Sequence, residues 1–174
     1  MARERAILTS IRFLLLVFVP DPWIAYLHEP MRTNDDILLM EGAHITMHVR
    51  PSERLMLQTW RGFVPSGTFR SIMDRALVHA KRLDVQRWFN DLRKMEAILQ
   101  KDEKWTMEDW FPRLAMTNVS RMAFLMSSDY FNQRSVDRIM QVGTEMMPLS
   151  VGYFDDAEEA RSWLLSSEPA MEPV

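Results

Sequence analysis

The sequence of 174 residues contains no cysteine. This absence excludes disulfide bonds, thiol nucleophiles and thiolate metal sites, and it fits a reducing compartment. The chain also has no large excess of either charge, because the formal net charge is −3 and the basic residues form no runs. The sequence therefore gives no electrostatic reason to expect nucleic acid or a polybasic membrane tether. We expect a cytoplasmic protein.

The chain also lacks a long apolar run. Residues 13–19 are the only unbroken part of the apolar N-terminal stretch, against the roughly 20 residues that a membrane-spanning helix needs. We therefore expect no stable membrane insertion. Residues 1–34 are predicted to be an N-terminal extension, for which three interpretations stay open. They are a poorly ordered or loosely docked extension, a weak membrane-surface anchor, or an upstream segment included by a mistaken start codon, with Met31 or Met40 as the true start.

Motifs of the common catalytic and metal sites are missing as well. No G-x-S-x-G motif occurs, and residues 127–129 are typical of a strand-to-helix cap. His44 and His48 would lie about 13 Å apart along a strand, too far to share one ion. The acids within residues 101–104 alternate with lysines, which predicts a solvated helix start. We expect no catalytic residue, no metal and no cofactor.

From residue 35 the sequence shows regular strand and helix patterns. Residues 36–41, 44–49 and 54–64 are rich in strand formers and separated by short turns, which predicts an antiparallel meander. A helix with one apolar face is expected next, over residues 66–83, and Ser66 is a candidate N-cap.

Strands and helices alternate in the rest of the chain. Strands are predicted over residues 85–92, 121–127 and 149–154, and helices over 102–117, after 127–129, and over 155–165. Asp156 and Glu159 have the spacing of a capping box, which predicts Asp156 as the N-cap of the last helix. Pro112 is expected to kink or break the first of these helices, because it lacks the amide that would bond Glu108. The order β-β-β-α-β-α-β-α-β-α implies an α/β fold with a mixed sheet and about four helices. We place this single domain at residues 35–167 and a disordered tail at 168–174.

Five segments in this order resemble STAS-like proteins, which are related in fold to the bacterial anti-sigma-factor antagonists and to STAS/Sec14-type modules. The segments are "WRGFV", "WFNDLRKM", "EDWFPRL", "FLMSSDYF" and "VGYFDDAEEARSWL". The resemblance covers roughly two-thirds of the chain and is greatest to small uncharacterised bacterial proteins. It implies a STAS-like fold over the predicted domain.

The resemblance also implies a function. STAS-like modules are non-enzymatic regulators that bind a partner protein or, in some relatives, a small or lipidic ligand. In the antagonists, a serine just after the corresponding fourth strand is phosphorylated, and that loop docks the partner kinase. Residues 90–95 occupy this position here and contain no serine or threonine. We therefore expect a docking surface without a phosphorylation site.

We predict that this surface lies between the strand at 85–92 and the helix at 102–117. The candidate partner-binding residues are Asp91, Arg93, Lys94, Trp105 and Trp110. An arginine suits planar recognition of a carboxylate, and an exposed tryptophan is typical of a binding hot spot. The partner would be another protein or a second copy of the chain.

One alternative is a carrier of a small apolar or lipid ligand, with a pocket between the sheet and the tryptophan-bearing helix. A cavity of ligand size there would favour it, and a filled interior would exclude it. An enzyme is a third alternative, and it would need a convergent acid–base pair with shifted pKa values that the sequence does not show.

Overall fold

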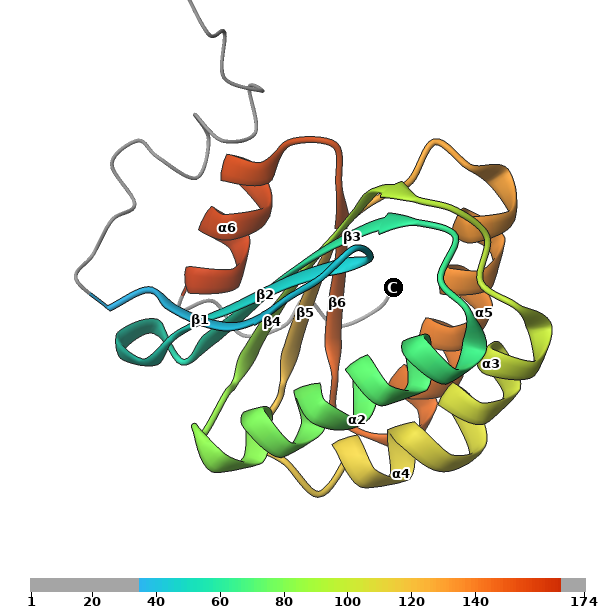
Figure 1. Ribbon diagram of the computed structural model, residues 1–174. Helices are drawn as coiled ribbons and strands as arrows, with labels where there is room; N and C mark the ends of the chain where they lie inside the picture. Colours follow the sequence, from blue (N-terminus) through green and yellow to red (C-terminus); the bar gives the residue numbers. More distant parts are fainter. Residues whose placement is uncertain (1–34, 167–174) are drawn as a thin grey trace, which may run out of the picture. The chain divides into compact units, whose positions relative to one another are not determined.

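Six strands form one mixed sheet in sequential order in the computed structural model, which describes residues 35–166 (Figure 1). The strands are β1 (Ile37–Glu41), β2 (Ile45–Arg50), β3 (Leu55–Gly62), β4 (Arg87–Met95), β5 (Arg121–Leu125) and β6 (Ser150–Phe154). The first three pair in antiparallel fashion, and β3 to β6 are parallel. The mixed α/β sheet predicted from the sequence is confirmed. The predicted N-terminal extension and the tail lie outside the described residues.

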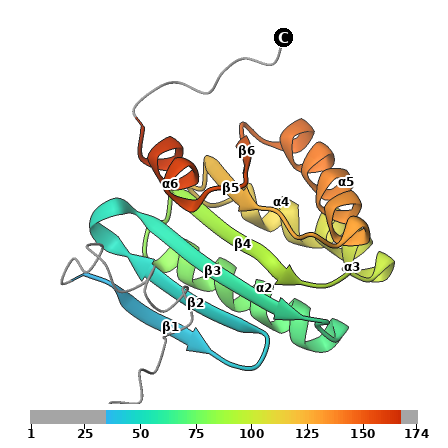
Figure 2. The ribbon, with the colours of Figure 1, turned by 90° about the horizontal axis from the view of Figure 1, so that it is seen from above.

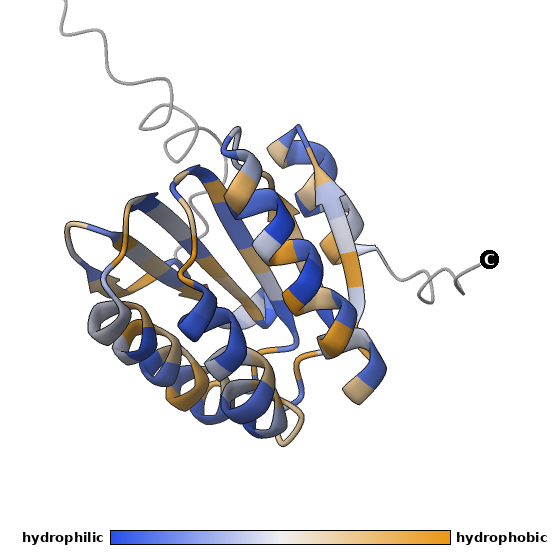
Figure 3. Cartoon of the chain, turned by 90° about the vertical axis from the view of Figure 1, so that its right-hand side faces the viewer, coloured by the Kyte–Doolittle hydropathy of each residue, from blue (hydrophilic) through white to orange (hydrophobic). Residues whose placement is uncertain are grey.

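Helices cover the two faces of the sheet unequally. The crossovers between the parallel strands contain α2 (Ser66–Arg82), the composite helix α3 (Gln100–Trp105) with α4 (Phe111–Leu114), and α5 (Tyr130–Met146). All of these lie on one face, whereas α6 (Ala157–Leu165) lies on the other, where it contacts β4, β5 and β6 (Figures 1 and 2). Apolar and polar bands alternate along the helices, as expected of helices with one buried side (Figure 3).

The core lies between the sheet and the crossover helices. Alternation along β3 turns Met56, Gln58 and Trp60 into this layer, and all three are buried. Residues Met122 to Leu125 of β5 are all buried, because helices cover both faces of that strand.

The helix does not break at Pro112, so this part of the prediction is wrong. The turn Thr106–Trp110 before it is π-helical, and the amide of Phe111 donates to the carbonyl of Thr106. The missing proline amide therefore falls just after a wider turn, where the hydrogen-bond ladder has already shifted. Residues 100–114 form one continuous helical unit of three parts.

Two of the predicted N-caps are confirmed. The Asp129 carboxylate accepts from the amide of Asn132 at 2.8 Å at the start of α5, and Asp156 accepts from Glu159 at 2.9 Å at the start of α6. Ser66 is not a cap. Pro65 takes that position in α2, and the Ser66 hydroxyl donates to Asp102.

Two arginines hold the C-terminal end of α6 against the sheet. Arg87 on β4 donates to the carbonyl of Leu164 at 2.8 Å, and Arg121 on β5 donates to those of Trp163 and Ser166 at 2.9 and 2.7 Å. The Arg121 guanidinium also lies 5.4 Å from the centre of the Trp163 ring. These cations bind carbonyls that the helix leaves without partners, at the negative end of its dipole.

Candidate functional site

The strand β4 extends past its predicted end at Leu92 and contains a bulge. Asp91 pairs with Thr59 and Lys94 with Arg61, so Leu92 and Arg93 together stand opposite one residue of β3. The pairing of β4 with β5 ends at Asp91, so the last part of β4 has only β3 as a partner. Bulges often re-aim side chains next to functional sites.

Asp91 and Arg93 bind each other at this bulge. Arg93 donates from Nε to Asp91 Oδ1 at 3.0 Å and from Nη2 to Oδ2 at 3.1 Å, which is a two-pronged ion pair. The Asp91 side chain is buried, whereas about a third of the Arg93 side chain is exposed. The guanidinium thus already binds a carboxylate of its own strand. Placing Asp91 on an open docking surface was wrong, because its charge is buried and paired.

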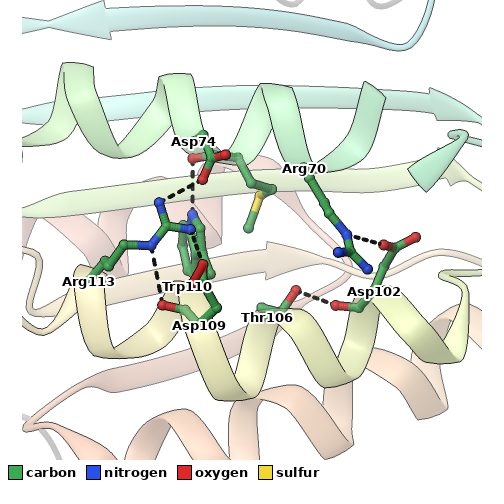
Figure 4. A network of polar contacts seen from close by, with 8 residues as sticks. Arg70, Asp74, Asp102, Thr106, Asp109, Trp110 and Arg113 are labelled. Carbon is green, nitrogen blue, oxygen red and sulfur yellow. Dashed lines mark hydrogen bonds and ion pairs between the residues drawn. The ribbon is translucent and has the colours of Figure 1, made fainter. Parts of the chain in front are cut away.

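Trp110 belongs to the core, which corrects its prediction as a surface residue. Its side chain is 2% exposed, and its ring packs against Trp88 and Phe111 at centroid distances of 5.7 and 5.6 Å. Its indole Nε1 donates to the carbonyl of Met73 on α2 at 3.0 Å (Figure 4). Because the π-helical turn directs this ring toward the sheet, it is not available to a partner.

Trp105 is partly buried between two arginines. The guanidinium groups of Arg70 and Arg113 lie 5.2 and 5.7 Å from its ring centre. Each arginine also forms an ion pair, Arg70 Nε with Asp102 Oδ1 at 2.7 Å and Arg113 Nη1 with Asp74 Oδ1 at 2.8 Å (Figure 4). The ring therefore helps to attach the composite helix to α2.

The structure does not bring the five predicted residues together. Trp110 packs in the layer between the sheet and the crossover helices, whereas Asp91 alternates with the inward residues of β4 and so faces the other side. Lys94 is exposed near the end of β4, with Arg93 beside it. Only these two lie near the exposed edge that the carboxyl ends of the strands form.

Two aromatic residues at this edge were missed. Tyr130 and Phe131 begin α5 directly after β5, are 65% and 70% exposed, and contact each other edge to face at 5.8 Å. The signal was present in "SSDYF", because both positions lie just after the cap and off the apolar stripe of α5.

Hydrogen bonds join the start of α5 to the end of β4. The Ser127 hydroxyl donates to the carbonyl of Met95 at 2.7 Å, and the Asn132 amide donates to that of Glu96 at 2.8 Å. The Glu96 amide in turn donates to the carbonyl of Gly62, the residue before exposed Phe63. We name the exposed residues at this place the carboxyl edge: Phe63, Lys94, Glu96, Tyr130 and Phe131.

The acids Asp102 and Glu103 are both buried, so the predicted solvated helix start was wrong. Glu103 accepts from Ser135 at 2.6 Å and from Arg138 at 2.7 and 2.9 Å. Burial raises the pKa of Glu103, but the hydrogen bonds from Arg138 and Ser135 and the charge of Arg138 outweigh it. The pKa is consequently lowered from its ordinary value of 4.5.

A cavity of about 60 Å³ lies between the sheet and the crossover helices, where the sequence placed the alternative ligand pocket. It is partly open, and β3, β4, β5, α2, the π-helical turn and α5 all contribute to its wall. The wall is mostly apolar, and its polar side chains include Gln58, Trp88, Asn90 and Thr106. The volume is well below the roughly 300–1,000 Å³ of sites for drug-sized ligands, which disfavours a lipid.

Within residues 35–166 no group of three His, Asp or Glu side chains is placed to hold a metal ion. His44 and His48 have separate neighbours, the carbonyl of Arg61 at 3.2 Å and the carboxylate of Asp36 at 3.5 Å. No helix in this part of the chain combines the length and the apolar character needed to cross a membrane.

Comparisons with known proteins define the fold class. No protein-family model and no curated protein matches the chain. Among solved structures, the chain is similar to an uncharacterised protein of the DUF3478 family from Shewanella loihica PV-4, which has a SpoIIAA-like fold. The TM-score is 0.50 at 11% sequence identity, over 72% of this chain and 98% of that one. The chain therefore has a SpoIIAA-like, STAS-like fold, which confirms the predicted class, and the likeness shows the fold alone.

Proposed function

We propose that the domain is a non-enzymatic protein-interaction module that docks a partner through the carboxyl edge. The observation that supports this most strongly is the exposed aromatic pair Tyr130–Phe131. Large apolar side chains that stand together on a surface mark interaction sites, and tyrosine is enriched among residues that dominate binding energy. Two exposed side chains in contact are also partly ordered before a partner arrives, which lowers the entropic cost of binding.

The setting of the pair supports the same function. The bonds from Ser127 and Asn132 fix the start of α5 to the end of β4, so the aromatic rings stand on a rigid base. Lys94 and Glu96 add one exposed charge of each sign to the carboxyl edge. An apolar centre with a charged rim is the usual anatomy of a specific protein interface, and the rim charges contribute to specificity and association rate.

The buried acids favour binding over catalysis. The three buried acids of the described residues are Asp91, Asp102 and Glu103. Each is bonded to an arginine: Arg93, Arg70 and Arg138, respectively. The oxygens of a carboxylate held by an arginine are already bonded within the fold, so these groups serve as structural ion pairs.

The test uses the double substitution Tyr130→Ala with Phe131→Ala on the full chain. Its matched control is Met116→Ala, because Met116 is also 70% exposed but follows α4, away from the carboxyl edge. Affinity capture from the native host with quantitative mass spectrometry selects proteins retained by the unaltered chain and by the control. Each is then purified and titrated calorimetrically against all three chains.

We expect the double variant to weaken binding at least about 30-fold, as for a hot-spot residue, with an unchanged circular dichroism spectrum. The control should bind like the unaltered chain. Equal affinity for all three chains would contradict the proposal. If the retained protein is the chain itself, sedimentation velocity must show a dimer that the double variant does not form.

A further inference from the structure

The orientation of the Gln58 amide is fixed by a tryptophan. Trp60 Nε1 lies 3.3 Å from Gln58 Oε1. An indole nitrogen only donates hydrogen bonds, so the atom facing it must be the amide oxygen. The amide nitrogen Nε2 therefore points elsewhere, and it has no hydrogen-bond acceptor within residues 35–166. Gln58 is 1% exposed, so water at the protein surface does not reach this donor.

Trp88 carries a second donor of the same kind. Its side chain is 1% exposed, and its Nε1 has no acceptor in the described part of the chain. The neighbouring indoles differ, because Trp60 donates to Gln58 and Trp110 donates to the carbonyl of Met73. The lack of an acceptor is thus specific to Trp88 and does not hold for its neighbouring core tryptophans.

The side chains that carry the two donors lie on the same face of the sheet. Gln58 pairs with Asn90 across β3 and β4, and Trp88 is two residues before Asn90 on the same face of the sheet. Both side chains line the cavity of about 60 Å³. Buried N–H groups are nearly always bonded, and each one left without a partner destabilises the fold.

We propose that this cavity binds a small neutral molecule whose carbonyl oxygen accepts hydrogen bonds from Gln58 Nε2 and Trp88 Nε1. A carbonyl oxygen has two lone pairs, one for each donor, and it needs no acceptor from the wall. An alcohol would in addition need an acceptor for its own O–H group. The rest of the wall is mostly apolar and includes Met73, Met95 and Met140, so it fits a short aliphatic body. A charged ligand is disfavoured, since neither a cationic nor an acidic side chain lines the cavity.

The volume limits the size of this molecule. A cavity of about 150 Å³ accepts benzene, so in proportion about 60 Å³ accommodates only about two to three heavy atoms. This space fits the carbonyl end of a simple ketone or of another short aliphatic molecule. The partly open mouth allows the remainder of a longer molecule to extend outward.

The test compares acetone with isobutene, which has the same shape but no oxygen acceptor. The full chain is labelled with ¹⁵N and with ¹³C at the methionine methyl groups, and each probe is titrated by NMR. We expect acetone to shift the Trp88 indole N–H resonance in a saturable way. In Trp88→Phe, acetone affinity measured at the methionine methyl groups should fall about five- to tenfold, the effect of one hydrogen bond.

The matched control is Trp110→Phe, which alters the same cavity wall but leaves both free donors in place. Its preference for acetone over isobutene should remain. The proposal is overturned if the two probes bind the unaltered chain equally. It is also overturned if acetone causes no saturable shift while the Trp88 N–H shows magnetisation transfer to bound water only. The comparison of acetone with isobutene on the unaltered chain tests the proposal even if a variant fails to fold.

Discussion

Asp102 and Glu103 are neighbours in α3, yet their carboxylates bind two different helices. Asp102 accepts from Ser66 and Arg70 of α2, whereas Glu103 accepts from Ser135 and Arg138 of α5. Successive residues of a helix point about 100° apart, so one acid can serve each neighbour. This pair fixes the composite helix between its two partners, above the cavity.

The substitution Asp102→Ala should destabilise the domain by about 2–3 kcal/mol, because it removes bonds from Ser66 and Arg70 to a buried charge. Urea unfolding monitored by tryptophan fluorescence measures the change. Asp109→Ala is the control. It removes an exposed ion pair with Arg113 and should cost less than about 1 kcal/mol. Equal losses for both would show that the Asp102 contacts add little to stability.

Glu103 should make stability depend on acid pH. Its pKa is lowered in the folded chain, so the contribution is complete above the ordinary value of 4.5 and is lost as pH falls through the folded pKa. Glu103→Gln should therefore destabilise the domain at pH 7, by about 1–2 kcal/mol, and progressively less below pH 4.5. Unfolding curves across this range, with exposed Glu108→Gln as control, measure the difference. A gap that stays constant down to pH 3 would contradict the prediction.

Gly143 is predicted to tolerate no side chain. An added Cβ would stand 2.5 Å from the ring of Phe111, which is fully buried, so the packed core would have to shift. Gly143→Ala should destabilise the domain by about 1–3 kcal/mol through overpacking. Gly67→Ala is the matched control in α2, since no atom lies within 4 Å of its added Cβ, and it should be neutral or slightly stabilising. Thermal unfolding of the two variants distinguishes these outcomes.

Arg93 is predicted to act through Asp91 rather than through a partner. Arg93→Ala leaves the buried Asp91 carboxylate without its two-pronged bond and should cost about 1–3 kcal/mol. The double variant Arg93→Ala with Asp91→Ala should recover part of that loss, because it removes the buried charge. If Arg93→Ala instead loses its partner in a pull-down while its free energy of unfolding is unchanged, Arg93 contacts the partner directly.

The sequence was sufficient for the element order, because that order depends on local patterns. Alternation, turn residues and the caps Asp129 and Asp156 all act within a few residues. The end of β4 was placed too early, because residues 90–95 are polar and resemble a loop. Their strand conformation depends on pairing with β3, which a local pattern does not reveal.

The candidate site was harder to predict for the same physical reason. Asp102 and Glu103 lie between lysines and look solvated, but their arginine partners are 32 and 35 residues away in the chain. Trp110 was assigned to the surface because helical spacing alone does not show that a π-helical turn directs it inward. Long-range pairing and one irregular turn thus decide which residues reach the surface.

The π-helical turn Thr106–Trp110 has a consequence for how the length of the chain can change in evolution. Such a turn holds one residue more than a turn of α-helix. Deletion of one exposed residue there, such as Glu108, would narrow the turn to α-helical width and place Pro112 in a regular ladder, where its missing amide costs a hydrogen bond. A deletion of one residue in this connection is therefore expected to require a second change, the replacement of Pro112.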